Sequence, residues 1–194
     1  SPLLLDRLEA AFVRENVGFD FAAWAHLWAL AGDLGGCSRL LLVNDSVIGP
    51  LDDALFMGMM GRLRVSKADV VGLTACRSPV PHLQSYFLSF GARAVASPAL
   101  RDFLEGVRVL PTKELVIDAY EMRLTRQLEV AGLSVEALFP ALSDDPQSRD
   151  DTVFRWRMLL EAGFPFIKGS VLRSRREADR ARAQVPRGLL PPGA

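Results

Sequence analysis

A run of aliphatic residues that ends on three polar side chains constrains the fold of this chain most strongly. Residues 40–43 are four branched aliphatic residues in succession, a pattern typical of a strand buried on both faces of a sheet. Asn44, Asp45 and Ser46 follow directly, and residues 48–50 predict a turn. Open α/β sheets bind ligands at the carboxyl ends of their strands. The stretch therefore predicts a ligand site at Asp45 or, as the alternative, an Asx-turn in which Asp45 and Ser46 satisfy only local backbone donors.

The composition limits the classes of protein to which the chain can belong. Of its 194 residues, 49% are hydrophobic and 24% are charged, as expected for one globular domain that needs neither disulfides nor a structural metal. Lys and Arg together number 23, as do Asp and Glu, so we predict no nucleic-acid partner. The apolar stretches fall short of the roughly 20 residues that span a bilayer. Cys37 and Cys76 lack a C-x-x-C spacing, which favours a cytoplasmic location.

Hydrophobic periodicity and capping residues predict the order of helices and strands. This order is typical of an α/β fold with a mixed sheet flanked by helices. Because the chain opens on a helix and lacks an initiator Met, we expect a piece of a longer protein whose sheet lacks its first strand. Residues 1–172 are predicted to form one domain, and residues 173–194 an Arg-rich and then Pro/Gly-rich tail. The predicted helices cover residues 1–14, 20–32, 51–63, 97–104, 112–131 and 152–162, and the predicted strands cover residues 40–43, 68–74 and 82–90.

A second polar cluster lies in the loop before the helix predicted over residues 20–32. Gly18 allows the backbone to approach a ligand closely, and Asn16 stands two residues before it. The free N–H groups at the start of the helix favour an anion. Asp20, the predicted N-cap, uses some of those donors and adds a negative charge. A plain turn between two helices is therefore the alternative interpretation.

A third cluster lies on the helix predicted over residues 112–131. Asp118, Glu121 and Thr125 are spaced so that they share one helical face. Glu121, placed at the wall of a pocket, can act as the general base that deprotonates a hydroxyl group. The alternative is a polar helical face in contact with solvent.

A fourth cluster lies on the strand predicted over residues 82–90, in which polar and apolar residues alternate. His82, Gln84 and Tyr86 share one face of this strand, where their hydrogen-bonding groups suit a ligand with many hydroxyls. The sequence contains no Ser/His/Asp triad, Walker loop, G-x-G-x-x-G motif or zinc-ligand spacing.

Five motifs stand out when the polar clusters are taken together with their neighbours. In order along the chain they are Arg14-Glu15-Asn16-x-Gly18-Phe19-Asp20-Phe21-x-x-Trp24, Asn44-Asp45-Ser46-x-x-Gly49-Pro50, Asp69-x-x-Gly72-Leu73-Thr74, His82-Leu83-Gln84-Ser85-Tyr86-Phe87 and Tyr120-Glu121-x-x-Leu124-Thr125. These motifs, in this order, resemble those of the rhamnan synthesis F family. The resemblance extends to about Lys168 and implies a glycosyltransferase that builds rhamnose-containing and other bacterial surface polysaccharides, in the cytoplasm or at the inner face of the plasma membrane.

A fainter similarity links the chain to family-2 glycosyltransferases of the GT-A fold, and it is an argument by analogy. By this analogy Asp45 stands in the acidic metal-binding motif, which here has one carboxylate instead of two, and would hold Mg²⁺ or Mn²⁺ against the donor diphosphate. Glu121 stands near the catalytic base. The resemblance further implies donor-binding roles for Asn16, Gly18, Asp20, Asn44 and Ser46, and sugar-binding roles for His82, Gln84 and Tyr86.

The sequence thus predicts a glycosyltransferase that moves a hexose or deoxyhexose such as rhamnose from a nucleotide diphosphate to a growing glycan. The expected partners are the donor, with dTDP-rhamnose as one candidate, and a glycan acceptor. Two alternatives are a non-catalytic glycan-binding or scaffold domain of a polysaccharide-assembly complex and a nucleotide-sugar hydrolase. The Arg-rich residues 173–187 predict a solvated surface or, alternatively, contact with the inner membrane or with another domain.

Overall fold

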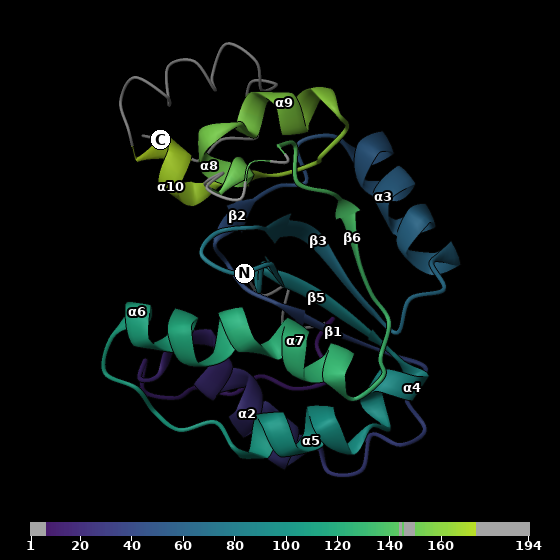
Figure 1. Ribbon diagram of the computed structural model, residues 1–194. Helices are drawn as coiled ribbons and strands as arrows, with labels where there is room; N and C mark the ends of the chain where they lie inside the picture. Colours follow the sequence, from purple (N-terminus) through teal and green to yellow (C-terminus); the bar gives the residue numbers. More distant parts are fainter. Residues whose placement is uncertain (1–6, 144, 146–149, 174–194) are drawn as a thin grey trace.

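The computed structural model describes residues 7–143, 145 and 150–173. They form a mixed sheet with helices packed against both faces (Figure 1), which confirms the predicted fold class. Within these ranges no helix is both long and apolar enough to cross a membrane.

The strands are β1 (Arg39–Val43), β2 (Val47–Ile48), β3 (Val70–Cys76), β4 (His82–Leu83), β5 (Phe87–Gly91), β6 (Val135–Phe139) and β7 (Ile167–Lys168). The helices are α2 (Phe19–Ala31), α3 (Asp53–Val65), α4 (Ala92–Val95), α5 (Pro98–Glu105), α6 (Lys113–Val116), the π-helical turn η1 (Ile117–Glu121), α7 (Met122–Val130), α8 (Asp151–Phe154), α9 (Trp156–Glu161) and α10 (Gly169–Leu172).

β3 is the central strand of the sheet. β6 runs parallel to β3 on one side, while β4 and β5 run antiparallel to it on the other. β1 pairs antiparallel with β5 and therefore runs in the same direction as β3. The carboxyl ends of β1, β3 and β6 consequently lie at one end of the sheet. β2 and β7 form a separate antiparallel pair.

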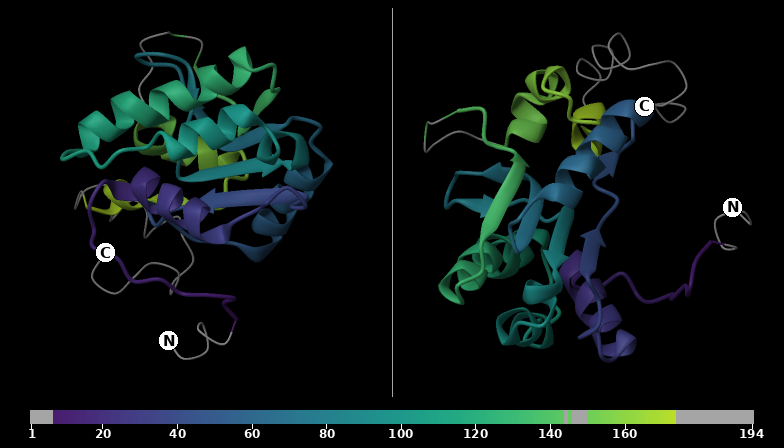
Figure 2. Two further views of the ribbon diagram at one scale, coloured as in Figure 1. Left: turned by 90° about the horizontal axis from the view of Figure 1, so that it is seen from below. Right: turned by 90° about the vertical axis from the view of Figure 1, so that its right-hand side faces the viewer.

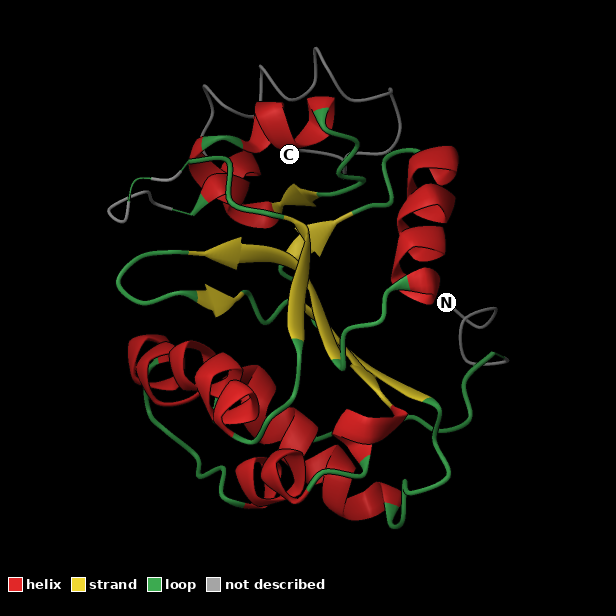
Figure 3. Ribbon diagram, turned by 45° about the vertical axis from the view of Figure 1, so that its right-hand side comes forward, coloured by secondary structure: helices red, strands yellow, loops and turns green. Residues whose placement is uncertain are grey.

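Alternate side chains of β3 pack against different helical layers, which the view in Figure 3 separates. Val70 belongs to the apolar cluster that includes residues of α2, α5 and α7, whereas Val71 and Leu73 belong to the cluster that includes α3. All three side chains are at most 1% exposed. Fully burying a side chain of this size stabilises the fold by about 1.5–3 kcal/mol. The sheet is therefore held from both faces, and it positions the loops at its carboxyl end.

β1 forms where the sequence predicts a strand, but the prediction that it is buried on both faces is wrong. β1 lies at an edge of the sheet and pairs with β5. Leu41 and Val43 are 40% and 49% exposed, while Leu40 and Leu42 pack against the core. An edge position needs only one apolar face, so an unbroken aliphatic run does not distinguish it from a central strand.

The helix predicted over residues 1–14 is absent from its described part. Residues 7–17 contain no regular secondary structure and extend away from the sheet (Figure 2), and residues 1–6 lie outside the described residues. Leu8, Phe12 and Val13 are exposed. Short amphipathic helices depend on burial of their apolar face. Without such burial, the helical spacing of these side chains does not produce a helix.

The strand predicted over residues 82–90 is interrupted. Leu83 pairs with Ala75 and Leu88 with Gly72, so the stretch from Leu83 to Leu88 is two residues longer than the stretch of β3 that it faces. The surplus residues form a bulge between β4 and β5. This bulge carries residues 84–86 out of the regular ladder.

The helix predicted over residues 112–131 is present, but η1 interrupts its α-helical pattern. The Thr112 hydroxyl accepts a hydrogen bond from the Leu115 N–H at 3.3 Å, which caps the helix as expected. The helix predicted over residues 152–162 is divided into α8 and α9. Apart from Arg173, the predicted tail over residues 173–194 lies outside the described residues. The other predicted helices and the strand over residues 68–74 form with shifts at their ends.

Candidate active site

A cavity of about 280 Å³ opens at the carboxyl ends of the parallel strands β1 and β3. Asn44 and Ser46 line it directly after β1, and Cys76 lines it at the end of β3. This location agrees with the rule that open α/β sheets bind ligands at strand ends. The volume lies near the lower end of the roughly 300–1,000 Å³ of ligand pockets, so the cavity suits one sugar or a diphosphate better than a complete nucleotide sugar.

The π-helical turn η1 supplies one wall of this cavity. Val116 and Glu121 line it, as do Ile117 and Met122, and the members of each pair are five residues apart, which is the hydrogen-bond spacing of a π-helix. Asp118, predicted to share the face of Glu121, is exposed and does not line the cavity. The π-turn changes the phase of the helix and so separates these two carboxylates.

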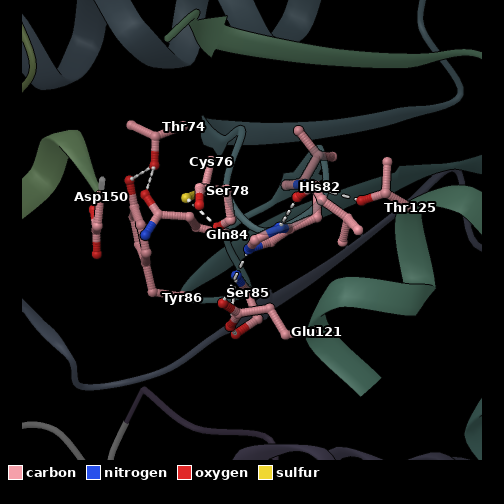
Figure 4. A network of polar contacts seen from close by, with 12 residues as sticks. Thr74, Cys76, Ser78, His82, Gln84, Ser85, Tyr86, Glu121, Thr125 and Asp150 are labelled. Carbon is pink, nitrogen blue, oxygen red and sulfur yellow. Dashed lines mark hydrogen bonds and ion pairs between the residues drawn. The ribbon is translucent and has the colours of Figure 1, made fainter. Parts of the chain in front are cut away.

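Glu121, the last residue of η1, is anchored by the bulge between β4 and β5 (Figure 4). Its Oε2 atom accepts hydrogen bonds from the Ser85 hydroxyl and, at 3.3 Å, from the Ser85 main-chain N–H. Its Oε1 atom lies 3.6 Å from His82 Nε2, and its side chain is 18% exposed. Burial raises the pKa of Glu121, but His82, Ser85 and the charge of Lys168 outweigh this effect and hold the pKa below its ordinary value. Glu121 is therefore ionised at neutral pH.

His82 is fixed by contacts at both ring nitrogens. Nδ1–H donates a hydrogen bond to the Val80 carbonyl at 2.7 Å, and Nε2 faces Glu121. Burial lowers the pKa of His82, but the contacts with Glu121 and Val80 reverse this effect and raise the pKa above its ordinary value. When His82 is protonated, its imidazolium and the Glu121 carboxylate form a buried ion pair.

Gln84 and Tyr86 lie on either side of Ser85 in the bulge, and both line the cavity (Figure 4). The Thr74 hydroxyl donates to Gln84 Oε1 at 2.6 Å, and its oxygen lies 2.6 Å from the Tyr86 hydroxyl. Because Thr74 has one hydroxyl proton, Tyr86 is the donor in the second bond. Burial raises the pKa of Tyr86 far above its ordinary value, so the phenol stays neutral. His82, Gln84 and Tyr86 thus reach one cavity, although they do not share the face of a continuous strand.

The polar triplet after β1 forms an Asx-turn built on Asn44. Asn44 Oδ1 accepts hydrogen bonds from the Ser46 N–H at 3.0 Å and the Ser46 hydroxyl at 2.7 Å, and Asn44 Nδ2 donates to Asp20 Oδ2 at 2.8 Å. The alternative prediction of an Asx-turn is therefore correct in kind, with Asn44 as its acceptor. Asp45 is exposed and does not line the cavity, whereas Asp20 does.

A metal ion beside the Asn44 turn would need oxygen ligands from both Asp20 and Asp45. Burial raises the pKa of Asp20; the hydrogen bond from Asn44 opposes the rise, and the negative charge of Asp45 adds to it. A cation would relieve this repulsion. Within the described ranges, no group of three or more His, Cys, Asp or Glu side chains converges as a metal site. The residues therefore fit Mg²⁺ or Mn²⁺ only if phosphate oxygens and water supply the other ligands.

Gly18 and Asn16 do not line the cavity. Gly18, and not Asp20, is the N-cap of α2, and its φ of 70° is in the left-handed region that favours glycine. A Cβ atom at Gly18 would lie 2.6 Å from Ala22 Cβ. Gly18 thus turns the chain into α2, which carries Asp20 to the cavity. Asn16 is exposed, and its donor-binding role stays a prediction.

Sequence reasoning missed several polar residues that line the cavity, above all Asp150 and Lys168. Asp150 caps α8 by accepting a hydrogen bond from the Thr152 N–H at 2.9 Å, a role that an Asp ahead of a predicted helix can indicate. Lys168 follows an apolar stretch and is partly buried, and buried lysines need a partner. Lys113, which lines the cavity from α6, was also missed, whereas Ser85, which lines it from the bulge, belongs to the polar cluster predicted over residues 82–86.

Comparison with known proteins identifies the family. The family model described as rhamnan synthesis protein F matches residues 2–186. The chain belongs to the rhamnan synthesis protein F family. The resemblance drawn from the five motifs is thereby confirmed, and family membership associates the chain with polysaccharide biosynthesis.

Two curated relatives are longer than this chain. It is 29% identical over 131 residues to the uncharacterized protein y4gN of Sinorhizobium fredii, with 65% of this chain and 34% of the relative covered. It is 27% identical over 192 aligned positions to the virulence protein VirA of Vibrio anguillarum, with 82% of this chain and 61% of the relative covered. The chain thus spans less than two thirds of the length of either relative. No solved structure gives a significant match.

Proposed function

We propose that the domain is a glycosyltransferase that moves a hexose or deoxyhexose, such as rhamnose, from a nucleotide diphosphate to a growing bacterial surface polysaccharide. The observation that carries the proposal is the ionised Glu121, anchored by Ser85 and His82 in the wall of a cavity at the carboxyl ends of two parallel strands. Family membership supports the polysaccharide context. Among donors, dTDP-rhamnose is the first to test.

In the proposed reaction, a hydroxyl oxygen of the acceptor attacks the anomeric carbon of the donor sugar. The bond from that carbon to the diphosphate breaks, its electron pair leaves with the diphosphate, and the hydroxyl proton passes to Glu121. The lowered pKa of Glu121 keeps the carboxylate ionised, and suits transfer of the proton after the acceptor oxygen has begun to bond to the sugar and its proton has become acidic. The anchored position of Glu121 reduces the entropy cost of reaching this geometry.

The donor diphosphate is proposed to bind beside the Asn44 turn. Asp20 and Asp45 would hold Mg²⁺ or Mn²⁺, which supplies positive charge to the leaving diphosphate. Ser46 lines the cavity next to this turn, and its hydroxyl would donate to a phosphate oxygen by exchanging its present bond to Asn44 Oδ1. Gln84 Nε2 can donate to a sugar hydroxyl, since the contact of Gln84 with Thr74 uses its carbonyl oxygen.

A transfer assay with the purified domain tests the proposal. We expect it to move rhamnose from dTDP-rhamnose to a rhamnose-containing oligosaccharide, and Glu121→Gln to lose this activity. Release of free rhamnose at equal rates with and without the acceptor would support a nucleotide-sugar hydrolase instead. Calorimetry gives the second readout, because glycan binding without binding of any nucleoside diphosphate would indicate a scaffold domain.

A further inference from the structure

A partly buried lysine lies in the candidate active site without a role in the reaction described above. Lys168 Nζ donates to Asp150 Oδ2 at 2.6 Å, and the two side chains are 20% and 24% exposed. Nζ also lies 5.9 Å from the centre of the Tyr86 ring, a cation–π distance. All three residues line the cavity that contains Glu121. The ammonium group is therefore held inside the cavity.

The strand pair β2–β7 places Lys168 next to the turn that is proposed to bind the diphosphate. Lys168 is the register partner of Val47, the residue that follows Ser46. The Gly169 N–H donates to the Ser46 carbonyl at 2.9 Å. A main-chain hydrogen bond therefore joins Ser46 to the residue that follows Lys168. Although 122 positions separate the two in the numbering of the chain, the ladder fixes Lys168 beside the Asn44 turn.

Asp150 holds the ammonium group but does not use all of its donors. Asp150 Oδ1 accepts from the N–H and the hydroxyl of Thr152 at the start of α8, which fixes the carboxylate, and Oδ2 accepts from Lys168. An ammonium group has three donors. Within residues 7–143, 145 and 150–173, Asp150 is the hydrogen-bond partner recorded for Lys168 Nζ. Two donors thus remain for a ligand in the cavity.

The chemistry of these groups favours an anionic ligand. A lysine ammonium is a compact point charge and a common ligand of phosphate. Asp150 has a pKa below its ordinary value; burial opposes this shift, and the charge of Lys168 together with the bonds from Thr152 produces it. The Asp150 carboxylate is therefore ionised and holds the ammonium group in place before a ligand arrives, so that no reorientation of the charge is needed during a reaction.

We propose that Lys168 binds the diphosphate of the nucleotide sugar from the β7 side of the Asn44 turn and stabilises the charge that builds up on the leaving group. This inference rests on the proposed glycosyltransferase function. When the bond between the anomeric carbon and the diphosphate oxygen breaks, its electron pair stays on that oxygen, and Lys168 remains protonated and donates hydrogen bonds to the departing diphosphate. The acceptor proton still passes to Glu121.

Calorimetric titration of the domain with nucleotides tests this role separately from transfer. The probes are dTDP, UDP and GDP, each compared with its nucleoside monophosphate in the presence of Mg²⁺. We expect wild type to bind one diphosphate more tightly than the matching monophosphate, and Lys168→Met to reduce that preference about 10- to 100-fold. Lys168→Arg should retain most of it. Lys67→Met, which removes an exposed lysine outside the cavity, should leave it unchanged.

A double variant separates binding from folding. Lys168→Met leaves the Asp150 carboxylate without its ion-pair partner, which by itself can destabilise the domain. In Lys168→Met/Asp150→Asn that charge is absent, so this variant should recover the melting temperature but not the preference for diphosphate. Equal preference in wild type and in a folded Lys168→Met variant would overturn the role of Lys168 and leave the proposed function intact. Failure of wild type to bind any nucleoside diphosphate would overturn both.

Discussion

The main-chain N–H of Ser85 donates to Glu121 Oε2 at 3.3 Å and joins the bulge between β4 and β5 to the last residue of the π-helical turn. Four residues further along the helix, Thr125 Oγ1 accepts from the Leu83 N–H at 2.9 Å. Two helical side chains therefore satisfy backbone donors of the interrupted strand. The bulge and the π-turn are each irregular. The segment that contains the bulge offers main-chain N–H donors, and the helix that contains the π-turn supplies the side-chain oxygens that accept from them. Together they fix the carboxylate in the cavity.

Glu121→Gln should abolish most of the proposed transfer while the domain stays folded. An amide cannot accept the acceptor proton, and positioned acid–base groups contribute about 10²–10⁴-fold to rate. Initial rates of transfer from dTDP-rhamnose, with the melting temperature of each variant, measure the effect. Asp118→Asn is the matched control, because Asp118 lies in the same π-turn but is exposed outside the cavity. A glutamine variant that transfers at nearly the wild-type rate would rule out Glu121 as the base.

Asp45→Ala should abolish metal-supported transfer, and Asp20→Asn should raise the Mg²⁺ concentration needed for half-maximal activity by at least about tenfold. The two carboxylates lie close enough for the charge of Asp45 to raise the pKa of Asp20, and we propose that a cation shared with the diphosphate relieves this repulsion. Mg²⁺ titrations of activity at saturating donor provide the measurement. Asp53→Asn, an exposed change in the first turn of α3, serves as the control. Unchanged Mg²⁺ dependence in both site variants would contradict the metal role.

Gly18→Ala and Gly58→Ala should change stability in opposite directions. At Gly18 the φ of 70° disfavours alanine, and the new Cβ would approach Ala22 Cβ to 2.6 Å, so we expect a loss of about 1–3 kcal/mol in the free energy of unfolding. Gly58 lies within α3 with open space at its Cβ position, where alanine should add about 0.5–1 kcal/mol. Urea unfolding followed by circular dichroism measures both. A Gly18→Ala variant as stable as wild type would show that α2 can begin from a different backbone conformation at residue 18.

Short sequence patterns correctly predicted individual strands and helix caps, because these depend on residues close together in the chain. The aliphatic run before Asn44 forms β1, and Thr112 caps the helix that carries Glu121. Apolar periodicity did not predict burial: Leu8 and Phe12 have helical spacing, but they are exposed and no helix forms. Propensity alone does not stabilise so short a helix.

The candidate site could be predicted only in part, because its geometry depends on pairings between distant segments. Alternation in residues 82–90 is compatible with a continuous strand, and only the register against β3 reveals the two surplus residues that turn Gln84 and Tyr86 toward the cavity. Lys168 reaches the site through the pairing of β7 with β2. No local pattern encodes that contact.

The His82–Glu121 pair should make stability depend on pH at both ends of its range. Because the pKa of Glu121 is lowered, its contribution to stability is present above the ordinary value of 4.5 and is lost as the pH falls through the lowered pKa. Because the pKa of His82 is raised, its contribution is complete below the ordinary value of 6.5 and is lost as the pH rises through the raised pKa. The pair should therefore stabilise the domain most between about pH 4.5 and 6.5.

Melting temperatures measured across this range for wild type and His82→Gln test the expectation. Wild type should lose stability relative to His82→Gln as the pH rises from 6.5 through the raised pKa of His82, because the variant has no imidazolium to deprotonate. His26→Gln is the matched control: His26 is the other histidine of the chain and is exposed on α2, so its variant should follow the wild-type curve. Parallel curves for wild type and His82→Gln as the pH rises above 6.5 would contradict an ionised pair, and Glu121 would then need another source of its lowered pKa.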